Sequence, residues 1–521
     1  HVGTAEMIFV VVLMYGAGVD YSLMLVSRYR ELLDAGLAAP QAAAESLDAT
    51  LPAILASAGT NTVGLFMLTF ATHGVFRTSG PVIAIALACA LVAALTLVPA
   101  MLGAIGPALF WPSRRMGQIG STRLWPAVAK ATIARPALVL VATFVLLGIP
   151  AIRGANLEWV YDALTGLTRD YSARRGSEMA WRHWAEGETT PVRVLVETKA
   201  PLTESQWRQT AETITTRLAA WNEVSNIRSL TWPLGKGRPR FAPPVPTSAP
   251  AHAPTGVIET LAPYLPSVSH VADSVRCNEI FNEYVDTDRR AMHFDVVLKH
   301  PGFSLPALAA AEALPGRILS VLPTQDPPQI HLAGITAETL DVKNVTRRDV
   351  ILIATLVLSV IFLMVLALLR DVLLSVFMIV STLLSYLATL GLTYWIFRFV
   401  AGSGGLDWKV QIFLFVVMVA VGQDYNIYLA ARLAQEALVV DTREAIRRAV
   451  VRTGPVISSC GVIMAATLGS LAVGDITLLT QLGVAMALGM LIDTFVVRPL
   501  LLPAFAALTG RTGRSRHKPV G

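Results

Sequence analysis

Charged residues are scarce in this chain. Of its 521 residues, 15% are Asp, Glu, Lys or Arg and 54% are hydrophobic, whereas a soluble domain carries about 25% charged residues. This composition excludes an ordinary soluble protein and indicates a membrane protein.

Cysteine and the common catalytic motifs are also missing or few. The three cysteines, Cys89, Cys277 and Cys460, are too few for a disulfide framework. The HExxH, CxxC, Walker A and nucleophile-elbow patterns are absent. The histidines of the polar segment also lack metal-ligand spacing, namely His183, His252, His270, His293, His300 and His331. We therefore expect no enzyme, no metal site and no cofactor.

An initiator methionine and a signal peptide are not present either, because the sequence starts at His1 and the first apolar run follows almost at once. We expect a fragment, or a chain whose start was lost.

Long apolar runs are what the chain has instead. A hydrocarbon core of ~30 Å takes about 20 helical residues to cross. We predict nine membrane helices, near residues 7–29, 52–72, 80–103, 135–152, 349–369, 372–397, 408–431, 455–474 and 478–507.

Basic residues concentrate in every second connection between these runs, as cytoplasmic loops do in membrane proteins. They occur at positions 28–30, 114–135, 370, 432–452 and 511–518. We therefore expect a multi-pass membrane protein whose polar segment, residues 153–346, lies outside.

The polar segment is predicted to be an α+β domain. A strand at 192–197, a helix at 204–221 and a strand at 226–232 are followed by a second set of the same kind, a strand at 293–299, a helix at 305–322 and a strand at 329–333. Strand–helix–strand given twice indicates a ferredoxin-like fold. Pro233–Gly256, rich in Pro, Ala and Gly, is predicted to be an irregular excursion.

These patterns divide the chain into six parts. We predict a first membrane repeat of three helices at 1–110, a basic cytoplasmic linker at 111–134, the leading helix of a second repeat at 135–152, the extracytoplasmic domain at 153–346, five more helices of the second repeat at 347–508, and a basic cytoplasmic tail at 509–521.

The two repeats are recognisable because residues 8–28 match residues 412–432 at nine positions, 404 positions apart. Both segments are predicted to run from outside to inside, so the repeats are parallel. The second repeat has a helix, an outer domain and two helices before its matched segment, and the first has no such part before residue 8. We expect that part to be missing from the front of repeat one.

The matched segments share an intramembrane dipeptide, Asp20-Tyr21 and Asp424-Tyr425. A carboxylate at membrane depth costs roughly 2.5–3.5 kcal/mol on insertion scales, so it is rarely there without a use. We interpret the four residues as a proton relay, in which a tyrosine hydroxyl can hold the hydrogen bond of the moving proton. The alternative is a hydrogen bond between helices that only fixes their packing.

Other candidates lie nearby. Asp493 comes a little over one turn before Arg498, and the two form either a part of the relay or a structural pair. Gly16, Gly18 and Gly422 are expected to let helices pack closely. Polar side chains on the following helices could bind the acids or their own helix backbone; these are Ser57, Thr60, Asn61, Ser458, Ser459 and Thr467.

Three runs resemble those of the MMPL-type transporters of the resistance–nodulation–division (RND) superfamily, namely GAGVDYSLMLVSRYRE (16–31), VGQDYNIYLAARLAQE (421–436) and LIDTFVVRPLLLPA (491–504). The resemblance implies a multi-pass α-helical protein of a bacterial inner membrane with RND-type parallel repeats, driven by proton flow. Family members have twelve helices and two outer domains, and many move lipids or other hydrophobic molecules.

The leading hypothesis is therefore a proton-coupled exporter of a lipid or another hydrophobic molecule, with a proton gradient rather than a cofactor and with no nucleic-acid partner. Two alternatives remain. One is a protein-export accessory of the SecD/SecF kind, whose motif reads Asp-Ala-Asn instead of Asp-Tyr. The other is a lipid-sensing, receptor-like membrane protein, which the paired acids disfavour.

Overall fold

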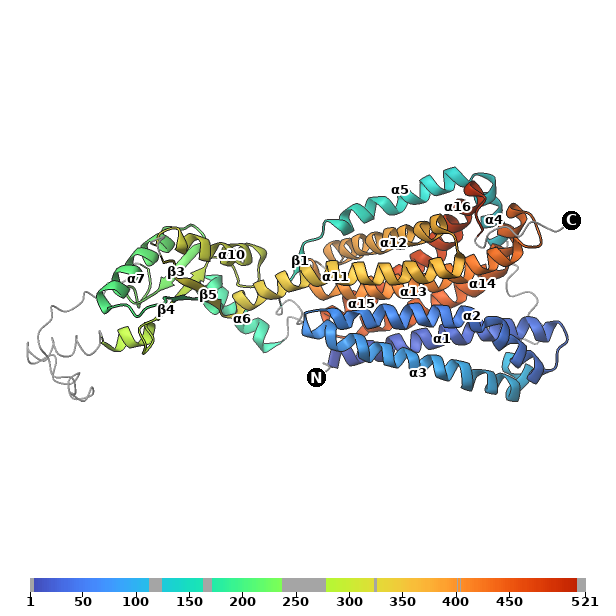
Figure 1. Cartoon of the computed structure of the whole chain (residues 1–521), viewed down its shortest axis with the longest axis horizontal. Coiled ribbons are helices and arrows are strands. Elements are labelled where there is room, and N and C mark those ends of the chain that lie inside the picture. The colour runs from blue at the N-terminus through green and yellow to red at the C-terminus, as the bar shows by residue number, and fades with distance from the viewer. Residues whose placement is uncertain are drawn as a thin grey trace, which may run out of the picture. The chain divides into compact units, whose positions relative to one another are not determined.

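The computed structural model of the chain describes residues 4–111, 124–162, 171–236, 278–322, 326–400, 402 and 404–512. These residues belong to two compact units, shown in Figure 1. The membrane unit comprises His1–Val160 and Val345–Gly521, and the outer unit comprises Tyr161–Asn344.

The first part of the membrane unit is a bundle of three long helices. Helix α1 spans Thr4–Asp34, α2 spans Ala39–Phe66 and α3 spans Gly74–Ile105, and each packs against the other two. The 3₁₀ segments η1 (Met67–Phe70) and η2 (Gly106–Phe110) extend α2 and α3. Helix α2 begins well before the predicted run, because its first turns are polar and an apolar run does not mark them.

The second part contains the remaining long helices (Figure 1). They are α5 (Pro136–Ala155), α11 (Ile335–Leu369), α12 (Val372–Phe399), α13 (Trp408–Glu436), α14 (Thr442–Gly469) with η4 (Ser470–Val473), and α15 (Thr477–Ile492) continued by the π-helical η5 (Asp493–Leu501) and α16 (Leu502–Thr509). The two-residue strands β1 (Trp159–Val160) and β6 (Leu406–Asp407) pair in parallel.

The predicted number of membrane helices is confirmed, because nine helices of the described chain are long and apolar enough to cross a membrane. Helix α13 is the most enclosed, with 94% of its apolar window buried. A helix that is apolar on all sides is expected to be buried on all sides. The second Asp-Tyr pair is therefore carried by a helix in the interior of the bundle.

Equivalent contacts relate the two repeats. A Cβ atom on Gly80 would lie 2.6 Å from the Cβ of Leu68, and a Cβ atom on Gly483 would lie 2.9 Å from the Cβ of Leu471. Gly483 follows Gly80 by 403 positions, and Leu471 follows Leu68 by the same number. The hairpin of α2 and α3 therefore recurs in α14 and α15.

Part of the predicted linker 111–134 is a helix, α4 (Leu124–Ala134), and residues 112–123 lie outside the described part. Its buried residues Trp125, Ala129 and Thr132 share one face at helical spacing, and α4 packs against α14. The sequence analysis missed this helix because eleven residues are too few for a membrane run. The predicted tail also lies outside the described residues from 513 onward.

The outer unit contains a four-stranded antiparallel sheet in the order β3-β4-β2-β5. The strands are β2 (Val192–Glu197), β3 (Val224–Arg228), β4 (Ala291–Leu298) and β5 (Gln329–Ala333). Helix α7 (Glu204–Ala219) connects β2 to β3, and α10 (Leu305–Leu319) connects β4 to β5. Two shorter elements precede the sheet, α6 (Ser172–His183) and η3 (Glu186–Thr189).

The observed order of elements agrees with the two predicted strand–helix–strand sets. The second strand begins and ends earlier than expected, at Val224–Arg228 instead of 226–232. Alternating residues of the sheet and one face of α7 form the core, in which Trp207 is 0% exposed and its indole N–H donates to the carbonyl of Arg289 at 3.0 Å. The predicted excursion Pro233–Gly256 lies outside the described residues from 237 onward.

Helices α5 and α12 approach each other unusually closely. A Cβ atom on Gly154 would lie 2.0 Å from the carbonyl oxygen of Leu387, and one on Gly391 would lie 1.9 Å from that of Pro150. Real Cβ atoms do not reach such distances from backbone, so this crossing depends on the two glycines.

We predict that Gly391→Ala destabilises the protein by roughly 1–3 kcal/mol, because the methyl group must push α5 and α12 apart. The measurement is the midpoint of thermal unfolding of the purified protein in detergent, followed by helical circular dichroism. Gly148→Ala on α5 is the matched control, since its Cβ meets no described atom within 4 Å. Equal midpoints for the two variants would show that the crossing is not tight.

Candidate functional site: a buried acid cluster

The two Asp-Tyr pairs lie on α1 and α13, and α2 packs against both of these helices. All four side chains are buried: the exposed fraction is 4% for Asp20, 0% for Tyr21, 6% for Asp424 and 3% for Tyr425. The structure thus places the four residues inside the bundle and not on a lipid-facing surface.

Asn61 of α2 joins the two pairs. Its Nδ2 atom donates to Asp424 Oδ2 at 2.5 Å and lies 3.3 Å from the hydroxyl oxygen of Tyr21. The hydroxyl group of Thr60 donates to the other oxygen of the Asp424 carboxyl, Oδ1, at 3.2 Å. Both oxygens of Asp424 therefore accept a hydrogen bond from α2.

Asp20 is placed differently. The Asp20 carboxyl oxygens make no hydrogen bond of close geometry among the described residues, and the side-chain donor that interacts with them is the hydroxyl group of Tyr425. The electrostatic neighbours of Asp20 are Tyr425, Asp424 and Arg498. An uncompensated buried charge costs several kcal/mol, so the gain or loss of a proton at Asp20 has a large effect on the local free energy.

Arg498 supplies the positive charge of the cluster. Its Nη2 atom lies 3.3 Å from Asp493 Oδ2 and 3.3 Å from the carbonyl oxygen of Gly422, and its guanidinium carbon lies 4.1 Å from the centre of the Tyr425 ring. The Asp493 carboxyl also accepts a hydrogen bond from Ser385 at 2.5 Å. The pair that the sequence analysis considered is present, but its contact with Tyr425 was not expected.

The π-helical segment η5 explains how Asp493 and Arg498 meet. Residues five apart do not face each other on an α-helix, whereas a π-helix brings positions i and i+5 together. The sequence contains the signal: Gly80 and Gly483 are 403 positions apart, but Pro99 and Pro503 are 404 apart. Repeat two thus has one additional residue in this interval, which the π-helical turn accommodates.

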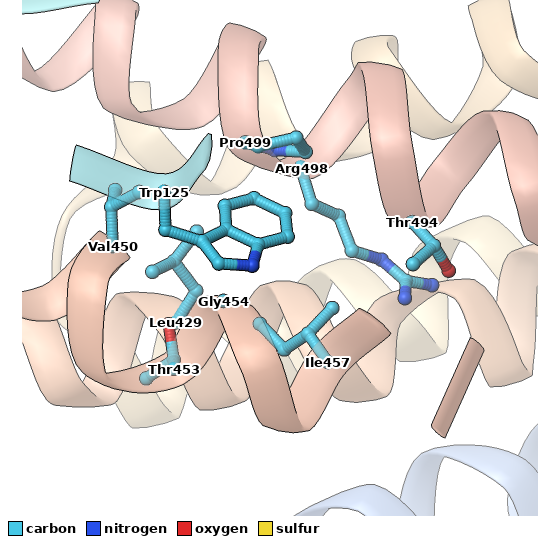
Figure 2. A pocket seen from close by; sticks show the side chains of 9 residues that line it. All are labelled: Trp125, Leu429, Val450, Thr453, Gly454, Ile457, Thr494, Arg498 and Pro499. Carbon is cyan, nitrogen blue, oxygen red and sulfur yellow. The ribbon is translucent and has the colours of Figure 1, made fainter. Parts of the chain in front are cut away.

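Figure 2 shows the other side of Arg498, which Trp125 of α4 covers. Gly454 of α14 makes room for the indole, because a Cβ atom there would lie 2.4 Å from Trp125 Cδ2. The cavity that remains between these residues and Thr494 has a volume of about 10 Å³, which is near the minimum for a single water molecule. Helix α4 therefore closes this side of the cluster.

The three glycines expected to serve packing behave differently. A Cβ on Gly16 would lie 2.7 Å from the sulfur of Met464, and one on Gly422 would lie 2.9 Å from Asp493 Oδ2. A Cβ on Gly18 would meet Ala90 only at 3.8 Å, which is an ordinary contact. Gly16 and Gly422 thus allow a close approach that Gly18 does not require.

The polar residues of α2 and α14 also differ. Thr60 and Asn61 of α2 donate hydrogen bonds to Asp424. In the described structure the hydroxyl groups of α14 donate only to backbone carbonyls of their own helix; they belong to Ser458, Ser459 and Thr467. Among these candidates, the hydrogen bonds to an acid come from α2 of the first repeat, and the acid is Asp424.

No group of three or more His, Cys, Asp or Glu side chains in the described residues could hold a metal ion. Cys460 is buried and Cys89 exposed, both as free thiols. Cys277, His252 and His270 lie outside the described residues.

Comparison with known proteins supplies the context of this cluster. The model of the MMPL family matches residues 1–139 and 178–519. A membrane protein of Streptomyces coelicolor is 30% identical over 96% of this chain and 53% of its own length. The apo-petrobactin exporter of Bacillus anthracis is 27% identical over 96% of this chain and 62% of its own length.

A shorter match is found with the sulfolipid-1 exporter MmpL8 of Mycobacterium tuberculosis, 34% identical over 35% of this chain and 17% of that protein. The crystal structure of SecDF, a translocon-associated membrane protein from Thermus thermophilus, has a TM-score of 0.52 at 13% identity and covers 97% of this chain and 55% of that one. This likeness shows the fold alone. The chain spans between about half and two thirds of the length of the relatives that it matches along most of its residues.

We predict that Arg498→Gln destabilises the protein by roughly 3–5 kcal/mol, because it leaves the Asp493 carboxylate buried without its partner. The double variant Asp493→Asn/Arg498→Gln should recover most of this loss. Thermal unfolding in detergent is the measurement.

The matched control for this pair is Arg511→Gln. Arg511 lies 3.0 Å from Asp371, but its side chain is 48% exposed, and an exposed pair contributes about 0–1 kcal/mol. If Arg498→Gln cost no more than Arg511→Gln, the buried pair would not stabilise the bundle.

Proposed function

The chain belongs to the MMPL family, and we propose that it is part of a proton-driven transporter. This transporter exports a lipid or another hydrophobic molecule through the cell envelope of a bacterium. The site that would use the proton is the cluster of Asp20, Tyr21, Asp424 and Tyr425. This function needs a proton gradient and no bound cofactor.

The observation that carries the proposal is the pairing of two acids from equivalent positions in one buried cluster. Asn61 of α2 joins Asp424 to Tyr21. Arg498 of η5 contacts the ring of Tyr425. The Asp20 carboxyl of the first repeat interacts with Tyr425, Asp424 and Arg498 of the second. Ionisable residues that are buried in membrane proteins most often serve transport or proton movement.

The energetics suggest how a proton would act. Two carboxylates in one low-dielectric cluster repel each other, and protonation of one removes this repulsion. Since Asp20 and Asp424 lie on helices of different repeats, a change in the repulsion changes the preferred separation of the repeats. A ligand can shift a two-state equilibrium only by its difference in affinity for the two states, and here the ligand would be the proton.

The substrate class rests on the family and on the names of relatives. By their names, two of these relatives export apo-petrobactin and sulfolipid-1. We propose a lipid or hydrophobic small molecule for this chain.

We predict that Asp20→Asn and Asp424→Asn each abolish transport and leave folding nearly intact, because an amide keeps the shape of the carboxyl group but cannot take up and release a proton. Tyr21→Phe and Tyr425→Phe should be milder, since each loses one hydroxyl group and no charge. The measurement is substrate movement in proteoliposomes of the full-length protein under an imposed pH gradient.

Asp475→Asn is the matched control for the acid variants, because Asp475 is exposed in a connection and should leave transport unchanged. Full activity in both acid variants would leave the carboxyl groups with a structural role only. The receptor-like function would then be favoured.

A further inference from the structure

A cavity of about 260 Å³ lies at the ends of α1, α2, α13 and α14 that carry the basic connections. Its polar lining consists of Arg28, Glu31, Tyr428, Arg432 and Arg452 with neighbouring residues. The volume holds several water molecules, and the basic connections indicate the cytoplasmic side of the membrane.

Tyr428 lies between this cavity and the acid cluster. It follows Asp424 by four residues on α13 and so shares its face. Its charged and titratable neighbours are Glu31 and Arg28 of α1, Arg432 of α13 and Cys460 of α14. Cys460 in turn interacts with Asp20, Tyr425 and Arg498, so Tyr428 has the cluster on one side and the cavity on the other.

The other approaches from this end are less suited to a proton. The counterpart of Tyr428 in repeat one, 404 positions earlier, is Met24, which is 6% exposed and has no exchangeable proton. On the side of Arg498, where Trp125 lies (Figure 2), the cavity has a volume of only about 10 Å³.

The charges around the cavity favour water over a bound anion. Arg28 pairs with Glu31 at 2.6 Å, and Arg432 and Arg452 both pair with Glu436, at 2.9 and 2.8 Å. Because each guanidinium already has a carboxylate partner, an anionic headgroup would have to displace an ion pair.

We propose that Tyr428 forms the inner end of the proton path and connects the acid cluster to the water of this cavity; the inference rests on the proposed function. Its oxygen accepts a proton from the cluster side, and its own O–H bond breaks toward a water molecule in the cavity. The hydroxyl group is neutral before and after, and one proton has moved.

The first experiment measures proton entry into proteoliposomes of the full-length protein with a trapped pH-sensitive dye. Tyr428→Phe should lower the initial rate at least ~10-fold, a modest share of the 10²–10⁴-fold that a positioned proton-transfer group contributes. Tyr15→Phe on α1 is the matched control, because Tyr15 is 63% exposed on the same bundle, and it should keep the full rate. The thermal midpoint of each variant shows that it is folded.

Asp20→Asn in the same assay distinguishes a failure of the role of Tyr428 from a failure of the proposed function. A normal rate in Tyr428→Phe together with no flux in Asp20→Asn would overturn the role of Tyr428 and leave the relay in place. Normal rates in both variants would overturn the proposed function itself.

The second experiment tests whether the cavity is open to water. In a background with the three native cysteines replaced by alanine, Ala53→Cys should react with a charged, membrane-impermeant thiol reagent added to inside-out vesicles, since Ala53 lines the cavity. Ala58→Cys on the same helix, at a site that is 1% exposed, should not react. Absence of labelling at Ala53→Cys would show a closed cavity and overturn the inference.

Discussion

The membrane provides no water to solvate a buried polar group, and the arrangement of this bundle depends on that constraint. Every acid within the helices must find a donor or a positive charge on a neighbouring helix, or remain uncharged. Asn61 and Thr60 satisfy Asp424 from α2, while Ser385 and Arg498 satisfy Asp493 from α12 and η5. These bonds fix which helices are neighbours, and Gly422 leaves room for the Asp493 carboxyl beside α13, since a Cβ atom there would lie 2.9 Å from Asp493 Oδ2. The packing of the helices and the hydrogen bonding of the buried acids therefore depend on each other.

The duplication is symmetric in its framework and asymmetric in its polar groups. Pro52 and Pro455 are 403 positions apart, and the same offset relates Asn61 to Met464. Asn61 of α2 reaches α13, and Met464 of α14 packs against Gly16 of α1, so each second helix crosses to the Asp-Tyr helix of the other repeat. One of these crossings supplies a hydrogen-bond donor and the other a thioether, which gives the two acids different surroundings.

Much of the fold and of the acid cluster was predictable from the sequence. The parts that were not predictable each have a physical reason. The number of membrane helices follows from apolar runs, and the paired Asp20 and Asp424 follow from the 404-residue offset. Which polar residue meets an acid does not follow, because helical spacing fixes a face but not the neighbour that it faces; Asn61 and Ser458 were equal candidates. The approach of Arg498 to Tyr425 depends on a π-helical turn, whose only signal is a change of one residue in the repeat offset. Helix α4 was missed because a short amphipathic helix beside basic residues has the composition of a linker.

Inequality between equivalent acids has a further consequence for a proton-driven cycle. In two identical sites a proton would occupy either carboxyl with equal probability, and the site itself would have no preferred order of protonation. Here Asp424 accepts hydrogen bonds from two α2 side chains, whereas the side-chain donor beside Asp20 is the hydroxyl group of Tyr425. A negative charge is thus better stabilised on one carboxyl than on the other. Under the proposed function, this inequality between the two carboxyl groups sets the order in which they take up a proton.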